Sequence, residues 1–242
     1  MVITTSLNKI SINEKYEFGG YSVSIIKTSK GMIKEDVGSL LSDKEITYFN
    51  RLFRNKKRQE EMYLGRLVAK RLVAENIRYE GQLKDIELIR KKDKEKPKLF
   101  INNIHINNDV SIAHNDMYVV VGFSHNDKIG VDVENFNLIL DRSFINYAFS
   151  KEEVEFWRKY EKEYSNIWIL LWTIKEAIGK ALDVGLSLGM DFIKILMNED
   201  KLSISFKKEE TIEKLIYGKN MELIYSEKDE NYISICRVWE GE

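Results

Sequence analysis

Residues 129–134, with the sequence IGVDVE, set the strongest limit on what this chain can fold into. Apolar residues alternate there with the carboxylates Asp132 and Glu134, a period of two that is typical of a β-strand with one buried face. The two acidic side chains therefore project together from the other face. Asp is depleted in strands and adjacent like charges resist ionisation, so a bound divalent cation would explain the pair. The alternative is a solvated face of an edge strand.

A second constraint is the pattern of a helix expected over residues 165–182. Glu176 and Lys180 lie opposite its apolar stripe. They could form a weak surface ion pair. Alternatively, Glu176 is a third carboxylate near the same metal and Lys180 is a cation that binds a phosphate. Trp168 and Trp172 also fall outside the stripe, which predicts that both helix faces are covered. The stripe consists of Ile167, Leu170, Leu171, Ile174, Ala177, Ile178 and Ala181.

The other patterns mix helices with strands, so the predicted fold class is α+β. Ser42 with Glu45 and Ser150 with Glu153 have the spacing of capping boxes. The polar loop at 125–128 predicts a hairpin. The expected helices are 42–51, 59–75, 143–148 and 150–160, and the expected strands are 21–26, 83–89, 98–101, 110–113, 118–124, 129–134, 201–206, 221–225 and 232–238, the last three forming a closing antiparallel sheet.

Charge divides the chain into two parts. Residues 1–128 carry 23 Lys and Arg against 17 Asp and Glu, whereas residues 129–242 carry 15 against 22. One Pro and 13 Gly leave no flexible linker between a basic and an acidic half. Such halves could bind an anion on one side and a cation on the other, or simply attract each other.

Composition excludes several classes. The longest apolar run, residues 167–172, is far shorter than a membrane-spanning helix, and the N-terminus has no export signal, so we expect a cytoplasmic protein with no membrane contact. Cys236 is the only cysteine, which removes intramolecular disulfides. The three histidines lack HExxH spacing, and no Gly-rich phosphate loop occurs.

Basic residues form two clusters in the first half, at 51–71 and 90–98. Either cluster could hold phosphates or nucleic acid, although such runs are usually solvated surface. With a pI near 6.4 and no nucleic-acid-binding motif, we expect no nucleic-acid partner. Lys96 precedes the only proline, Pro97, which would fix its direction. His114 follows a strand and is either a structural residue or a ligand.

Taken in order, these segments resemble the larger, Sfp-like 4'-phosphopantetheinyl transferases. The likeness covers about residues 40–190. The strongest matches are Gly130-Val131-Asp132-Val133-Glu134, Phe149-Ser150-Lys151-Glu152-Glu153, Trp172-Thr173-Ile174-Lys175-Glu176-Ala177-Ile178-Gly179-Lys180 and Gly185-Leu186-Ser187-Leu188, and weaker ones are Lys96-Pro97, Ala113-His114-Asn115 and Tyr63-Leu64-Gly65-Arg66-Leu67.

The resemblance implies a pseudo-dimer of two similar α+β halves, 1–128 and 129–242, each an antiparallel sheet packed with helices. Coenzyme A would lie between them, and the enzyme would move its phosphopantetheine to a serine of an acyl, peptidyl or aryl carrier protein, releasing 3',5'-ADP. A monomer would suffice. The implied metal ligands for Mg²⁺ are Asp132, Glu134 and Glu176, the catalytic residues Glu176 and Lys180, and the coenzyme A ligands Lys57, Arg66, Lys96, Pro97, His114 and Lys180.

The sequence also departs from the family pattern. Ala-His-Asn stands where Ser-His-Ser is common, Glu95 replaces a frequent glycine, and the basic position before Tyr63 is ambiguous among Lys56, Lys57 and Arg58. Three other readings stay open. These are a Mg²⁺-dependent hydrolase of coenzyme A or a nucleotide, an inactive homologue that binds coenzyme A, and a nucleic-acid-binding module.

Overall fold

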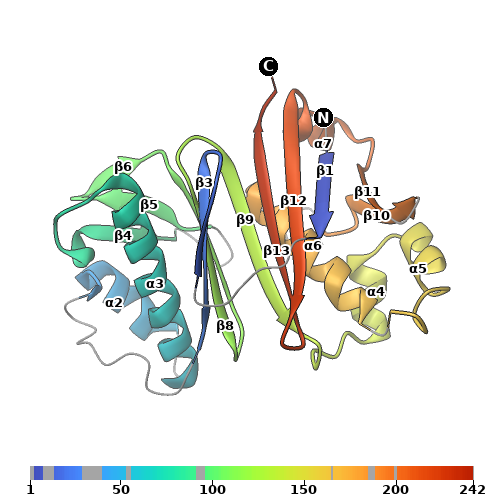
Figure 1. The fold of residues 1–242 in the computed structure, drawn as a ribbon, viewed down its shortest axis with the longest axis horizontal. Helices are drawn as coiled ribbons and strands as arrows, with labels where there is room; N and C mark the ends of the chain where they lie inside the picture. Colours follow the sequence, from blue (N-terminus) through green and yellow to red (C-terminus); the bar gives the residue numbers. More distant parts are fainter. Residues whose placement is uncertain are drawn as a thin grey trace.

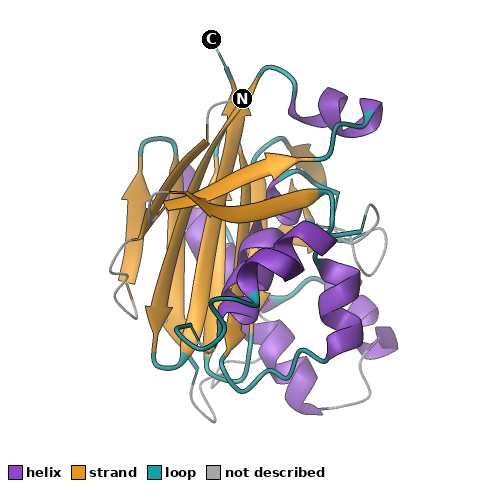
Figure 2. Ribbon diagram, turned by 90° about the vertical axis from the view of Figure 1, so that its right-hand side faces the viewer, coloured by secondary structure: helices purple, strands orange, loops and turns teal. Residues whose placement is uncertain are grey.

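Two β-sheets lie face to face in the computed structural model, and helices cover the outer face of each (Figure 1). Figure 2 turns the right-hand side of Figure 1 toward the viewer, so that helices of the C-terminal half lie in front of the sheets. The structure describes residues 3–7, 14–28, 40–52, 56–90, 96–164, 166–184, 189–198 and 201–241, without the side chains of 3–7, 14, 52 and 56–58.

The N-terminal sheet is antiparallel throughout and has the order β2-β3-β8-β7. Its helices pack on one face, and a three-stranded sheet, β4-β5-β6, lies beside them. The elements are β2 (Glu14–Phe18), β3 (Tyr21–Lys27), α2 (Asp43–Leu52), α3 (Lys56–Ile77), the 3₁₀ turn η1 (Leu83–Asp85), β4 (Ile86–Ile89), β5 (Lys98–Ile101), β6 (Ile104–Ile106), β7 (Asp109–His114) and β8 (Tyr118–Ser124).

The C-terminal sheet has the order β1-β12-β13-β9, in which only the β1–β12 pair is parallel. A two-stranded sheet, β10-β11, stands apart. The elements are β1 (Ile3–Leu7), β9 (Lys128–Asn135), α4 (Arg142–Ala148), α5 (Lys151–Trp157), α6 (Ile167–Ala181), β10 (Ile193–Asn198), β11 (Lys201–Phe206), α7 (Glu210–Ile216), β12 (Lys219–Lys228) and β13 (Asn231–Glu240).

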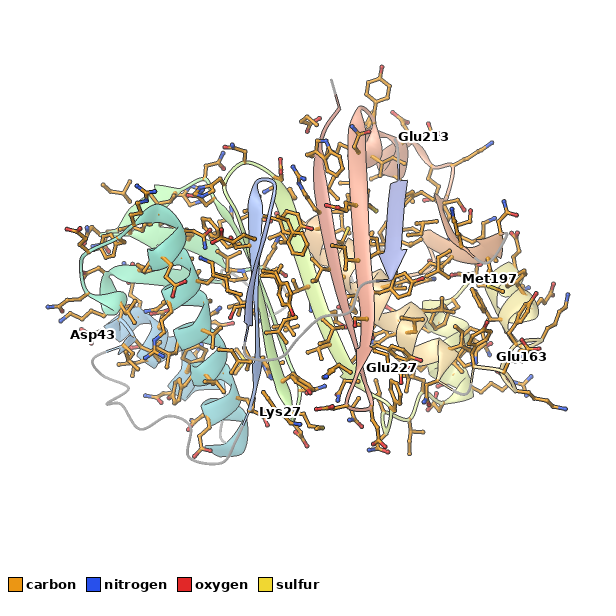
Figure 3. The ribbon with its side chains drawn as sticks, viewed as in Figure 1. Lys27, Asp43, Glu163, Met197, Glu213 and Glu227 are labelled. Carbon is orange, nitrogen blue, oxygen red and sulfur yellow. The ribbon has the colours of Figure 1, made fainter. Side chains whose placement is uncertain are left out.

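Among the described residues, three large apolar clusters and a small one formed by Leu41, Phe49 and Met62 make up the core. One fills the space between the two sheets and includes Val23, Val131 and Ile235. The second lies between the N-terminal sheet and α3, and the third between the C-terminal sheet and α6. Side chains fill each of these layers in Figure 3. The fold is therefore helix, sheet, sheet, helix, and none of the helices formed by the described residues is long and apolar enough to span a membrane.

The two sheets adjoin along β7 and β9, which no backbone ladder joins. Side chains of β7 bind β9 amides instead. Asp109 Oδ2 accepts from Ile129 N at 2.7 Å, and Ser111 Oγ accepts from Val131 N at 3.0 Å. Both contacts have the same offset along the chain, so the strands run side by side in the same direction. We call this contact the seam.

The structure confirms the α+β class and most expected elements, with four corrections. The predicted hairpin of β8 with β9 is wrong because the two strands belong to different sheets. Residues 201–206 do form a strand, but it pairs with β10 and not with the closing sheet. Residues 83–85 are a 3₁₀ turn, and the helix after Ser150 ends at Trp157. Whether the halves are repeats, and where they divide, stays a prediction.

Both predicted capping boxes are present, and each extends to a buried lysine. In the C-terminal half, Ser150 and Glu153 bond reciprocally at 2.8 and 3.3 Å, and Glu153 Oε1 also accepts from Ile195 N. Lys175 Nζ donates to Glu153 at 2.9 Å and to the carbonyls of Ala148 and Met190. One ion pair thus joins α5, α6 and β10.

The N-terminal half contains the same arrangement. Ser42 and Glu45 form the box, and Glu45 Oε1 accepts from Leu88 N of β4. Lys70 Nζ donates to Glu45 Oε2 at 2.5 Å and to Leu40 O at 2.8 Å. The ion pair joins α2, α3 and β4. We call the two arrangements the Glu–Lys clamps.

Gly130 sets how closely α6 approaches β9. A Cβ atom there would lie 1.9 Å from Ala177 O and 2.5 Å from Ala181 N. Any side chain would therefore push the helix backbone away from the strand. Glycine at this position brings the two elements that carry the acidic residues into contact.

We expect Lys175→Met to lower the free energy of unfolding by about 3–5 kcal/mol, because it leaves the fully buried Glu153 carboxylate without its partner. Urea unfolding followed by circular dichroism measures the change. Lys214→Met is the matched control, since Lys214 and Glu210 form an exposed pair whose loss should cost under about 1 kcal/mol. Equal effects of the two substitutions would contradict a structural role for the clamp.

Gly130→Ala should destabilise the protein by about 3 kcal/mol or more, because the helix backbone must move away from β9. Thermal unfolding compares it with Gly19→Ala, whose Cβ meets nothing within 4 Å and which should stay within about 0.5 kcal/mol of wild type. A neutral Gly130→Ala variant would show that the α6–β9 contact is looser than described.

Candidate functional site

The packing of α6 on β9 brings together four charged residues predicted from the sequence. Asp132 and Glu134 project from the α6 side of β9, and Glu176 and Lys180 lie one turn apart on the helix. Lys180 Nζ is 2.7 Å from Asp132 Oδ1 and donates to Val131 O at 3.0 Å. Trp168 and Trp172 are buried, as expected for a helix covered on both faces.

Burial changes the acidity of these groups. It raises the pKa of Glu134 to about 8, helped by the charges of Asp132 and Glu176, and that of Glu176 to about 7. It also raises the pKa of Asp132, against the effect of Lys180. Burial alone would lower the pKa of Lys180, but Asp132 and Glu176 raise it. Three carboxylates thus share one ammonium group, an excess of negative charge.

This donor set fits a divalent cation. Asp132 Oδ2 and Glu176 Oε1 are buried and accept no hydrogen bond, although such oxygens are normally satisfied. Within the described ranges, no three His, Cys, Asp or Glu side chains are already gathered as a metal site. Mg²⁺ commonly uses one or two carboxylates and takes its other oxygens from water and substrate phosphate, so the carboxylates here remain suitable.

In the N-terminal half, Arg66 on α3 is another predicted site residue with hydrogen-bond donors that have no partner. Its side chain is 1% exposed, and Nε and Nη2 have no hydrogen-bond partner. Its guanidinium lies 5.7 Å from the centroid of the Phe49 ring. Burial lowers its pKa to about 10, and the nearby Arg90 adds to that effect. The Glu45 carboxylate acts in the opposite direction but accepts no hydrogen bond from Nε or Nη2, so these two donors are suited to receive an anion.

His114 lies at the end of β7, near the same helix. Its Nε2 is 3.2 Å from Met62 Sδ, and Nδ1 is 3.9 Å from Glu61 Oε2. Asp109 pairs with Ile129 and Ser111 with Val131, an offset of 20 residues. The same offset places His114 opposite Glu134 on β9. His114 is thus on the α3 side of the seam and the carboxylates are on the α6 side. Lys57 belongs to the first turn of α3, and its side chain lies outside the described part of the chain.

Lys96 and Pro97 are at the seam but are not open to solvent. Lys96 is 8% exposed and forms an ion pair with Asp109, the residue that also binds the amide of Ile129. Burial lowers the pKa of Lys96, while Asp109 and the more distant Asp183 counteract it. Pro97 is buried. The expected contacts of Lys96 and Pro97 with a ligand remain predictions. Lys96 would have to bind the ligand while it also forms its ion pair with Asp109.

Sequence reasoning missed three neighbours of the site. The Trp172 indole donates a hydrogen bond to Glu134, Asp109 holds Lys96, and Ser234 on β13 lies opposite Asp132. The helical position of Trp172 was visible in the sequence, but its hydrogen bond was not. Asp109 and Ser234 carry no motif and become visible only through strand register.

Comparison with known proteins agrees in part with the sequence resemblance. Residues 128–233 match the model of the 4'-phosphopantetheinyl transferase superfamily. No match is found among curated proteins. Similar solved structures include holo-ACP-synthase from Plasmodium yoelii (22% identity, 49% of this chain and 97% of that chain, TM-score 0.39), holo-[acyl-carrier-protein] synthase from Neisseria meningitidis (16%, 47% and 98%, 0.40) and the Helicobacter pylori enzyme in complex with coenzyme A (22%, 46% and 99%, 0.38).

Proposed function

We propose that this protein is a Mg²⁺-dependent 4'-phosphopantetheinyl transferase of the larger, Sfp-like type. It transfers phosphopantetheine from coenzyme A to a serine of an acyl, peptidyl or aryl carrier protein. The observation that carries the proposal is the group formed by the buried Asp132, the half-buried Glu134 and Glu176, and Lys180 where α6 packs on β9. The superfamily match covers Asp132, Glu134, Glu176 and Lys180.

The two sides of the seam suit the two ends of the donor. Coenzyme A carries a diphosphate and a separate 3'-phosphate, and a cation bound by Asp132, Glu134 and Glu176 would neutralise the diphosphate during transfer. On the α3 side, Arg66 has unpartnered donors for a phosphate, with His114 nearby. An anion at Arg66 and a cation across the seam match the opposite charges of the two halves.

The reaction needs a proton acceptor and leaving-group stabilisation but no covalent enzyme intermediate. The serine oxygen of the carrier attacks the phosphorus that bears pantetheine, and the diphosphate bond to 3',5'-ADP breaks. Glu176 accepts the hydroxyl proton, directly or through a water. Lys180 lies beside Asp132, one of the residues that would hold the cation. From there it would donate to the oxygens of the phosphate bound at the cation, as charge develops on the leaving group.

The Glu–Lys clamps support an internal repeat, the second part of the proposal. Each half has a Ser–Glu capping box, a lysine from the following long helix, and a strand amide bound to the same glutamate. The strand orders β3-β8-β7 and β9-β13-β12 also correspond. Two such halves place one ligand-bearing helix on each side of the seam, α3 with Arg66 and α6 with Glu176, so a monomer would hold a complete site.

Intact-mass spectrometry of an apo carrier protein incubated with coenzyme A and Mg²⁺ tests the function. We expect a gain of roughly 340 Da, the mass of phosphopantetheine, and a loss of at least about 100-fold in rate for Glu176→Gln, which removes the proton acceptor. Glu155→Gln, an exposed residue on α5, should retain wild-type activity. Coenzyme A cleavage without carrier modification would instead favour a hydrolase, and binding without either reaction would favour an inactive homologue.

Arg66→Met should weaken coenzyme A binding about 10–100-fold without destabilising the unliganded protein, because a buried unpaired charge is removed. Isothermal titration with dephospho-coenzyme A, which lacks the 3'-phosphate, is the paired measurement. The variant and wild type should bind this compound equally. A similar loss of affinity for both ligands would mean that Arg66 binds a part of coenzyme A other than its 3'-phosphate. Unchanged affinity for both would mean that Arg66 does not contact coenzyme A.

A further inference from the structure

Ser234 on β13 is a buried residue whose hydroxyl has no assigned role. Its side chain is 0% exposed, and Oγ has no hydrogen-bond partner. Buried hydroxyls are normally hydrogen-bonded, and one left unsatisfied destabilises the folded state. Ser234 therefore requires an explanation beyond packing.

Strand register places Ser234 beside the candidate cation site. It is paired directly with Asp132 in the antiparallel β9–β13 ladder, so the two Cβ atoms are about 5 Å apart on one face of the sheet. Alternation fixes which face. Cys236 and Val238 belong to the cluster under α6, whereas Ile233 and Ile235 belong to the cluster between the sheets. Ser234 therefore faces α6.

The unsatisfied oxygens of the described residues gather at this one place. Three buried side-chain oxygens there lack a hydrogen-bond partner, and they belong to Asp132, Glu176 and Ser234. Asp132 and Glu176 act on each other electrostatically, and α6 packs on both β9 and β13. Although Ser234 and Asp132 are directly opposed, their oxygens do not bond each other. The three residues thus lie on the same side of the C-terminal sheet, where α6 packs on β9 and β13.

We propose that Ser234 is a positioning residue of the cation site, in which its hydroxyl holds a water of the ion's shell opposite Asp132. Mg²⁺ keeps several waters when bound by few carboxylates, and groups that orient such ligands contribute to affinity. A water bound to the ion donates its hydrogens outward, and the Ser234 hydroxyl oxygen can accept one of them. This inference rests on the proposed function for the identity of the ion.

Cation binding and thermal stability of Ser234→Ala in the full chain test the proposal. Mn²⁺ serves as the probe, measured by isothermal titration and by electron paramagnetic resonance. We expect affinity to fall about 10-fold, while the Tm of the metal-free protein rises by about 2–4 °C because an unsatisfied hydroxyl is removed. A residue that only packs would not give these opposite changes.

Ser226→Ala is the matched control, since Ser226 is 3% exposed on the neighbouring strand β12 and pairs with Ile233, which faces away from α6. It should leave Mn²⁺ affinity unchanged, and Asp132→Asn should abolish binding. Wild-type affinity in Ser234→Ala would overturn the proposal, as would absence of Mn²⁺ binding by wild type. Modification of a carrier protein by the wild-type enzyme, measured by intact mass, tests the transferase function separately. Modification without an effect of Ser234→Ala on Mn²⁺ affinity would overturn only the role of Ser234, and an effect on Mn²⁺ affinity without modification would overturn only the transferase function.

Discussion

The rest of the structure depends on the buried ion pair of Glu153 with Lys175. Its atoms reach three elements at once, through the Ser150 cap, the amide of Ile195 and two backbone carbonyls. Both side chains are completely buried, so each charge is tolerable only while the other is in place. The pair therefore holds α6, and with it Glu176 and Lys180, in a fixed position relative to α5 and β10. Lys175 has its three hydrogen-bond donors committed to this task, which sets it apart from its neighbour Glu176.

The clamp also explains how two sides of a site can be built from similar parts. Lys70 and Glu45 fix α3 in the same manner, and α3 carries Arg66. The long helices differ in the groups that they carry, a buried guanidinium with two unpartnered nitrogen atoms on α3 and a carboxylate and an ammonium on α6. Under the proposed function, activity would depend on a few positions on each helix, while a buried glutamate–lysine pair of the same form lies beneath them in both halves.

Much of this could be predicted from local patterns. The alternation in 129–134 located Asp132 and Glu134 on a strand, and the helical spacing located Glu176 and Lys180, because both features depend only on nearby residues. The capping boxes were predicted for the same reason. Contacts between residues that are distant in the sequence could not be predicted in this way. The hairpin error arose because a short polar loop does not reveal that its two strands enter different sheets, and Ser234 needed the β9–β13 register.

Buried polar atoms without a hydrogen-bond partner occur in both halves. They lower the stability of the fold, but they are the atoms that a ligand would bind. Each buried unbonded polar atom costs about 1–3 kcal/mol, and these atoms belong to Arg66 on one side and to Asp132, Glu176 and Ser234 on the other. Three apolar clusters and two clamps hold them in place. Between β7 and β9, the side chains of Asp109 and Ser111 form hydrogen bonds with β9 amides, and the apolar cluster between the sheets packs beside them. A ligand that bonded both sides would satisfy these atoms and tie the sheets together, so binding energy and the rigidity of the seam would be coupled.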